Sequence, residues 1–267
     1  MAQTVTTFDT PRNRILSSLP DEEMDLVLSM LEPEELAFGQ VLIESDRPIE
    51  YVHFPERALV SMLGAADDSA AVEVAMIGRD GMVGLPLFFG LDRTLMRGYV
   101  QIAGSAWRMT AEHFRALLYQ SATLERMVRR YAHASFFFAA QSSACNRLHN
   151  VMQRSARWLL TTQDAVGASR FRITHLVLAQ MLGVRRATVT ETAGLLQRAG
   201  HIAYNRGQVQ IVDRAGLEEV SCSCYALIRR EQERAMSDRE VPVRADVTRA
   251  APQPRSVVED ASSHLEG

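Results

Sequence analysis

The sequence contains no lysine, only three cysteines and no long apolar run. All 29 basic residues are therefore arginines, which we attribute to codon bias in a GC-rich, bacterial genome. Three cysteines cannot form a multi-bridge disulfide framework, so a reducing compartment is expected. No apolar run approaches the roughly 18 residues that a bilayer-spanning helix needs. The first residues also lack the basic-then-apolar pattern of a secretory signal. These absences predict a cytoplasmic protein with no membrane partner.

The charged residues are divided unevenly along the 267-residue chain. Its 47% apolar and 23% charged residues are typical of an ordinary globular protein of one or two domains. Residues 1–122 carry 9 Arg against 18 acidic residues, whereas residues 123–236 carry 16 Arg against 8 acidic residues. The small net charge of −3 therefore hides an acidic first part and a basic second part. This asymmetry favours contact between the second part and a polyanion such as DNA.

The first half has two patterns. Residues 12–37 carry apolar residues at helical spacing, which predicts one or two short helices. From residue 38 to residue 109 the pattern changes to short β-branched segments separated by turn residues. Short strands at intervals of roughly 8–12 residues predict a sandwich or barrel. The expected strands are Val41–Ile43, Tyr51–Phe54, Leu59–Leu63, Val72–Ile77, Tyr99–Ala103 and Ser105–Met109.

A long helical pattern follows from Leu124 to Asp164, without Gly or Pro. Its apolar residues recur at near-heptad spacing, which predicts a seam that pairs with a second copy of the helix. A single helix packed on its own domain is the alternative, and a break before Gln153 that divides the stretch in two stays open. The seam residues are Leu124, Tyr131, Phe138, Cys145 and Met152, with Met127, Ala134, Gln141 and Leu148 beside them.

The segment from Ile173 to Asp213 has the spacing of a helix-turn-helix. Ala179 is small where the two helices cross, and Gly183 tolerates a positive φ in the turn four residues later. Val189, six residues after the glycine, supplies the buried branched residue of the second helix. An ordinary pair of antiparallel helices is the alternative. The other expected core residues of the motif are Leu178, Leu182 and Val184.

Two alternating segments follow the second helix and flank the turn sequence Asn205-Arg206-Gly207-Gln208. This pattern predicts a β-hairpin, and two helices followed by a hairpin make a winged helix-turn-helix. The first residues of the second helix would then face the major groove of double-stranded DNA. These candidate DNA-binding residues are Arg185, Arg186, Ala187, Thr188, Thr190 and Glu191, with Arg206 at the tip of the hairpin.

Over about residues 12–235 the chain resembles the Crp/Fnr family of bacterial transcription regulators. The resemblance is carried by GQVLIESDRPIEYVHFPERALVSM and VEVAMIGRDGMVGLPLFFG in the first half, and by CNRLHNVMQRSARWLLTTQD and LAQMLGVRRATVTETAGLLQRAGHI in the second. It implies an α+β fold: an N-terminal double-stranded β-helix, called a β-roll or jelly roll (12–122), a dimerisation helix (123–149) and a winged helix-turn-helix (150–235). The tail, residues 237–267, has three prolines and no apolar periodicity, so we expect it to be disordered. The partners implied are double-stranded DNA, a second copy of the chain and RNA polymerase.

The resemblance also assigns roles within the recognition helix. That helix in the family commonly reads Ser-Arg-Glu-Thr-Val, a small residue, then Arg. Arg186 therefore inherits the arginine that reads the O6 and N7 acceptors of guanine. Ala187 replaces the glutamate that would accept from cytosine, and Glu191 replaces an arginine, so we expect an altered half-site. Arg185 and Arg206 are expected to contact phosphates.

The first half departs from the family members that bind cyclic nucleotides. In those proteins a Gly-Glu loop holds the ribose and an Arg-Ser/Thr pair holds the phosphate. Here Leu85-Pro86 stands at the position of the glutamate, and Arg93-Thr94 falls about three residues early. We therefore expect a regulator that does not depend on cyclic AMP. A regulator that responds to a nucleotide or other small molecule through a non-standard pocket is the alternative, as is one without any small ligand; the effector stays unknown.

No metal or cofactor is expected from the sequence. Residues 1–122 contain no cysteine, which argues against an N-terminal iron–sulfur cluster. Cys222 and Cys224 lie two apart on an expected helix and so point to different faces, and Cys145 is expected to pack on the seam. A haem ligand among the histidines stays open; the candidates are His53, His113 and His133.

An enzyme with a cupin-like cavity is the alternative from a different functional class. Cupin metal chemistry needs clustered His and Glu on the strands, and only His53 and Glu73 lie on them. The sequence also lacks a nucleophile–base constellation and a phosphate-binding glycine loop. We therefore expect a regulator and not an enzyme.

Overall fold

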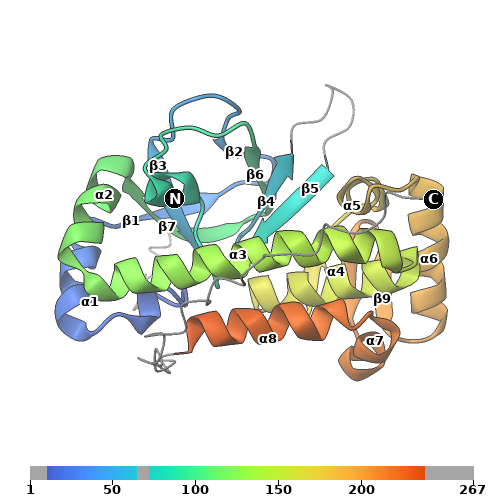
Figure 1. Ribbon diagram of the computed structural model, residues 1–267. Coiled ribbons are helices and arrows are strands. Elements are labelled where there is room, and N and C mark those ends of the chain that lie inside the picture. Colours follow the sequence, from blue (N-terminus) through green and yellow to red (C-terminus); the bar gives the residue numbers. More distant parts are fainter. Residues whose placement is uncertain (1–10, 65–71, 238–267) are drawn as a thin grey trace, which may run out of the picture. The chain divides into compact units, whose positions relative to one another are not determined.

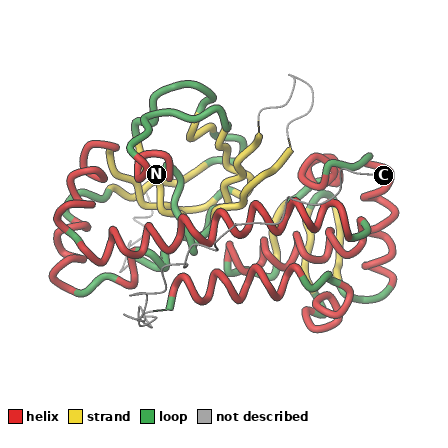
Figure 2. The backbone as a smooth tube through the Cα atoms, in the orientation of Figure 1, coloured by secondary structure: helices red, strands yellow, loops and turns green. Residues whose placement is uncertain are grey.

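The computed structural model describes residues 11–64 and 72–237 (Figures 1 and 2). They form a mixed fold of antiparallel sheets and helices, which confirms the expected α+β class. The expected disordered tail, residues 237–267, lies outside the described residues apart from Ser237. Among the described helices, none is long and apolar enough to cross a membrane.

Two antiparallel sheets form the first half. One has the order β1-β7-β3 and the other the order β2-β6-β4-β5. All six strands expected from the alternation are present within two residues of their expected bounds. Their inward side chains, such as Phe54, Val60 and Met109, share one apolar core with the helices before and after them. The strands are β1 (Glu32–Leu36), β2 (Val41–Ile43), β3 (Tyr51–Pro55), β4 (Leu59–Gly64), β5 (Val72–Ile77), β6 (Arg97–Ile102) and β7 (Gly104–Thr110).

The expectation of helix throughout residues 12–37 is wrong at its end. The 3-10 helix η1 (Leu16–Ser18) and α1 (Asp21–Leu28) are present, but Glu32–Leu36 is the edge strand β1. β1 pairs with β7, and the Arg108 guanidinium donates to the Glu32 carboxylate at 3.0 and 3.1 Å. Pairing across the sheet overrides the helical preference of this acidic segment, and an edge strand tolerates Pro33.

Three helices lead from the sheets to the second half: α2 (Ala111–Gln120), α3 (Ala122–Leu148) and α4 (Val151–Val166). The long helical pattern is thus divided, because Asn150 starts a new helix. The Asn150 side chain accepts from the backbone N–H of Gln153, and the Gln153 side chain accepts from the backbone N–H of Asn150. This reciprocal capping box satisfies two donors that a helix start leaves free.

Most of the predicted dimer seam on α3 is buried within the chain itself, although Leu148 at the end of the helix is 74% exposed. The side chains of its first half pack into the core of the sheets, and the rest face α4 and α8 (Cys224–Met236), which runs beside α3 (Figure 1). Packing within one chain therefore explains the heptad-like spacing of these residues. The expectation that they contact a second copy of the helix is corrected accordingly. Buried to 9% exposure or less are Leu124, Met127, Tyr131, Phe138 and Cys145.

The second half is built around a second apolar core, with Trp158, Phe171 and Leu196 among its members. Its three-stranded sheet has the order β8-β10-β9. The remaining elements are β8 (Arg170–Arg172), α5 (His175–Leu182), α6 (Arg186–Arg198), β9 (Ile202–Asn205), β10 (Gln208–Ile211) and α7 (Arg214–Val220).

Candidate nucleic-acid interface

A tight turn joins α5 to α6. Gly183 ends α5 with φ of 63°, a conformation that favours glycine, and the Val184 N–H donates to the Ala179 carbonyl at 3.0 Å. Arg185 then precedes the first residue of α6. The side chains expected to form the core of the motif lie between the two helices, where Val184 is half-buried. The fully buried ones are Leu178, Ala179, Leu182 and Val189.

The N-terminal turns of α6 present the candidate base-reading residues to solvent. Thr188 is half-buried. The Thr190 hydroxyl donates to the Arg186 carbonyl at 3.1 Å and lies 2.9 Å from His175 Nδ1, so it ties α6 to α5. The exposed residues of this set are Arg185, Arg186, Ala187, Thr190 and Glu191.

The hairpin β9–β10 forms the expected wing. Arg206 and Gly207 at its tip have φ of 47° and 77°, the left-handed pair of a type I′ turn. This turn fits the twist of the two strands and holds the Arg206 side chain exposed. The wing thus carries a positive charge at its tip, at a position fixed by backbone geometry.

The strand β8 was missed from the sequence, and it adds two arginines to the wing sheet. It pairs with β10, so that Arg172 lies opposite Gln208 and Arg170 opposite Gln210. Arg170 Nη2 donates to Gln210 Oε1 at 2.6 Å, while Arg172 is exposed. The alternation of arginine and apolar residues from Arg170 to Ile173 was the available signal.

An aromatic contact joins the wing to α5. The rings of His175 and Tyr204 have centroids 4.3 Å apart, and the Tyr204 hydroxyl donates to the Ile173 carbonyl at 2.7 Å. Burial, together with the nearby Arg186 guanidinium, holds the pKa of His175 below its ordinary value. This shift favours the neutral form of the imidazole beside the arginines of the interface.

One polar network connects the sheets to α4. Glu73 on β5 accepts from the Trp158 indole N–H at 2.8 Å and from the Ser61 hydroxyl at 2.5 Å. Burial is the main influence on this carboxyl and raises its pKa to about 7. The network makes a titratable contact between the first half and the helix that leads to α5 and α6.

The segment at the position of the family's cyclic-nucleotide-binding loop has a different backbone structure and different ion pairs. Leu85 and Pro86 open the 3-10 helix η2 (Leu85–Phe89), after Gly84 in a left-handed conformation. The Arg93 guanidinium is half exposed and pairs with the neighbouring Asp92 at 3.2 Å. Arg93 thus forms a surface ion pair with the residue that precedes it in the chain.

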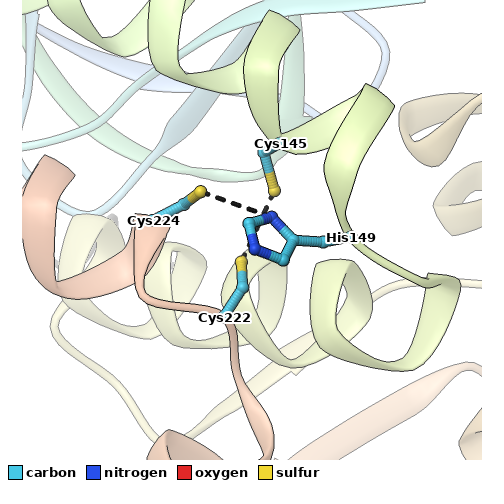
Figure 3. A group of neighbouring side chains, drawn as sticks. All are labelled: Cys145, His149, Cys222 and Cys224. Carbon is cyan, nitrogen blue, oxygen red and sulfur yellow. Dashed lines mark hydrogen bonds between the residues drawn. The ribbon is translucent and has the colours of Figure 1, made fainter.

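All three cysteines lie together with His149 at the junction of α3, α4 and α8 (Figure 3). The expectation that Cys222 and Cys224 point apart is wrong, because Cys222 lies in the loop before α8 and only Cys224 belongs to the helix. Their side chains can therefore turn toward the same point. A hydrogen bond from Cys222 holds the pKa of the Cys145 thiol well below its ordinary value and raises that of Cys222.

Known proteins match this arrangement. Residues 153–220 match the model of the Crp-like helix-turn-helix domain. FixK2 from Bradyrhizobium japonicum shares the fold with a TM-score of 0.61 at 16% identity, over 72% of this chain and 98% of that one. A putative Crp/Fnr-family transcriptional regulator from Eubacterium rectale gives 0.58 at 16%, over 76% and 95%. The c-di-GMP-responsive regulator CLP from Xanthomonas campestris gives 0.56 at 14%, over 72% and 99%. No curated protein sequence matches significantly.

The exposed start of α6 and the hairpin β9–β10 have the geometry of a winged helix-turn-helix, the class of domain that residues 153–220 match. The two sheets, the long helix and the C-terminal domain together make the fold of a Crp/Fnr-type transcriptional regulator, as the sequence motifs predicted.

Proposed function

We propose that the protein acts as a homodimer that binds an inverted repeat in double-stranded DNA and regulates transcription in the cytoplasm. The observation that carries this proposal is the exposed, arginine-rich start of α6 beside a wing with Arg206 at its tip. These groups match the phosphate and base contacts of a helix in the major groove. RNA polymerase is the further partner that such a regulator needs.

Arg186 is the residue that we expect to read a base. It lies exposed in the first turn of α6, where its planar fork can donate to O6 and N7 of guanine. The test is capture and sequencing of sheared genomic DNA by the purified chain, without added ligand, beside Arg186→Ala. We expect an enriched inverted repeat that Arg186→Ala binds about 10- to 100-fold more weakly. Arg230→Ala, which removes an exposed arginine from α8, is the matched control.

The same experiment tests the proposal that the regulator does not depend on cyclic AMP. This proposal is supported by the surface ion pair of Arg93 with Asp92, and by Leu85-Pro86 where the resemblance expects the sugar-binding glutamate. Enrichment without added ligand is the expected result. Enrichment that appears only after cyclic AMP is added contradicts the proposal.

The outer face of α3 is the proposed dimer contact. Phe136 on this face is 74% exposed, although it belongs to a helix whose opposite face is buried. Small residues surround it at helical spacing, so a second helix can approach closely. They are Ala132, Ala139, Ala140 and Ser143.

Phe136→Arg tests this contact by placing a charge at its centre. We expect the dimer to dissociate in analytical ultracentrifugation and affinity for the inverted repeat to fall about 100-fold, because the two half-sites are then bound separately. Tyr119→Arg, at a 94% exposed aromatic residue of α2, controls for the added charge. A stable Phe136→Arg dimer would refute this interface.

The arrangement of the strands supports a role in binding rather than in catalysis. His53 on β3 lies 3.2 Å from Glu34, and Glu73 belongs to the other sheet, where it binds Ser61 and Trp158. The two residues expected from the sequence, His53 and Glu73, are thus on different sheets, and the carboxylate beside His53 belongs to Glu34 on β1. Our proposal therefore includes no reaction.

A further inference from the structure

Four potential metal ligands meet at the junction between the two halves. Cys145 lies in the last turn of α3, His149 ends that helix, and Cys222 and Cys224 flank the start of α8 (Figure 3). All of their ligand atoms lie within 4.8 Å of one another. These side chains come from segments more than 70 residues apart, so the fold itself brings them together.

The separations suit one tetrahedral ion. The Cys145 and Cys222 sulfurs are 3.5 Å apart, and the Cys224 sulfur is 3.6 Å from His149 Nδ1. In a tetrahedral zinc site with Zn–S of about 2.3 Å, neighbouring ligand atoms are about 3.5–3.8 Å apart. The distance between Cys224 Sγ and His149 Nδ1 is within that range, and the distance between the Cys145 and Cys222 sulfurs is at its lower limit. An iron–sulfur cluster spreads its ligands over several irons, so these four ligands are too close together for one.

The surroundings suit an anionic site that is closed to solvent. The three cysteines are at most 4% exposed. Gln141 Nε2 donates to the Cys224 sulfur at 3.1 Å, a contact that orients a ligand and stabilises its thiolate. Three thiolates and an imidazole around a divalent ion carry one net negative charge, which a buried cation would offset.

Buried cations are present beside the cluster. Arg154 and Arg157 on α4 are 8% and 5% exposed, and both interact electrostatically with the Cys145 thiolate. Nε of both residues and Nη1 of Arg157 have no hydrogen-bond partner among the described residues. Arg157 also interacts with the Glu73 carboxyl, whereas Arg154 forms no ion pair among the described residues. A buried guanidinium without a carboxylate is costly unless another anion lies nearby.

We propose that Cys145, His149, Cys222 and Cys224 bind one thiophilic divalent ion of the zinc class in a closed tetrahedral site. The ion displaces the thiol protons to solvent on binding. It joins the end of α3 to the start of α8, directly before Asn150 begins α4. The site therefore fixes the angle at which the DNA-binding half leaves the long helix. This proposal is independent of how the protein reads DNA.

The first test is the metal content of the full chain, purified in reducing buffer without added metal, by mass spectrometry. We expect about one zinc per chain. Cys145→Ser and Cys222→Ser should lose at least nine-tenths of it. Ser223→Ala, an exposed residue between two of the ligands, is the matched control and should retain it. Gln141→Leu should retain the site with about tenfold weaker affinity.

The second test does not depend on the folding of any variant. Cobalt(II), added to the unmodified chain after chelation of its metal, should give the intense visible bands of a tetrahedral thiolate site and raise the unfolding temperature. A folded chain that holds no zinc and gives no such bands overturns the proposal. A disulfide between Cys145 and Cys222 in the protein purified under reducing conditions overturns it as well.

Discussion

Two sites with buried charged side chains, Glu56 in the first half and the arginines of α4 in the second, differ in how those charges are satisfied. In the first half, the Glu56 carboxylate accepts from the backbone N–H groups of Arg12 and Asn13, at 2.8 to 3.0 Å. In the second half, Arg154 donates to the Leu182 carbonyl, but neither it nor Arg157 pairs with a carboxylate within the described residues. The Glu56 carboxylate is therefore satisfied by its own chain, whereas the Arg154 and Arg157 guanidinium groups keep donors without acceptors among the described residues.

Loss of the Glu56 carboxylate should lower the unfolding free energy more than any other substitution predicted below. Glu56→Ala leaves the buried N–H of Asn13 and the partly buried N–H of Arg12 without their acceptor, which costs about 3 kcal/mol of unfolding free energy. In the metal-free chain, Arg157→Met should instead be neutral or stabilising by about 1 kcal/mol, because it removes a buried charge whose Nε and Nη1 have no hydrogen-bond acceptor among the described residues. Urea unfolding of both variants after chelation measures the two effects. If both variants lose stability equally, the halves do not differ in this respect.

The contact between the halves should make stability depend on pH. Burial raises the pKa of Glu73 from 4.5 to about 7, so the folded chain retains a proton that the unfolded chain releases between these values. The unfolding free energy should therefore fall by about 3 kcal/mol as the pH rises from about 4.5 to about 7.

Glu73→Gln should remove this slope and make the protein more stable than the unmodified chain at pH 8. Trp158→Phe removes a donor that stabilises the carboxylate, and should move the slope to higher pH. Urea unfolding at a series of pH values provides the measurement. An unchanged slope in Glu73→Gln would assign the pH dependence to another group.

The smallest effect is expected at two helix starts, one in each half. Thr110 caps α2 by accepting from one backbone N–H at 3.1 Å, whereas Asn150 begins α4 with a reciprocal capping box. Thr110→Ala should cost about 0.5–1 kcal/mol and Asn150→Ala about 1–2 kcal/mol. Chemical unfolding compares the two variants directly. A larger loss in Thr110→Ala than in Asn150→Ala would show that the hydrogen bond from the Asn150 N–H to the Gln153 side chain adds no stability.

Local patterns predicted much of this fold. Alternation located six strands within two residues, because strands with one buried face must alternate. The turn at Gly183 and the tip at Arg206-Gly207 were also found, since only a few residue types adopt positive φ there. Elements that depend on contacts between distant segments were missed. The segment of β1 was expected to be helical, and β8 was overlooked because three residues are too few to show a clear alternation.

The sequence by itself determined the order of the elements, the helix-turn-helix and the asymmetry of charge, all of which depend on neighbouring residues. Only the tertiary structure decided which face of α3 is covered, because α8 returns to it from about 80 residues further along the chain. The same return of α8 brings Cys222 and Cys224 to Cys145 and His149. Spacing along one helix cannot reveal such a meeting, since the ligands come from two distant segments that only packing brings together.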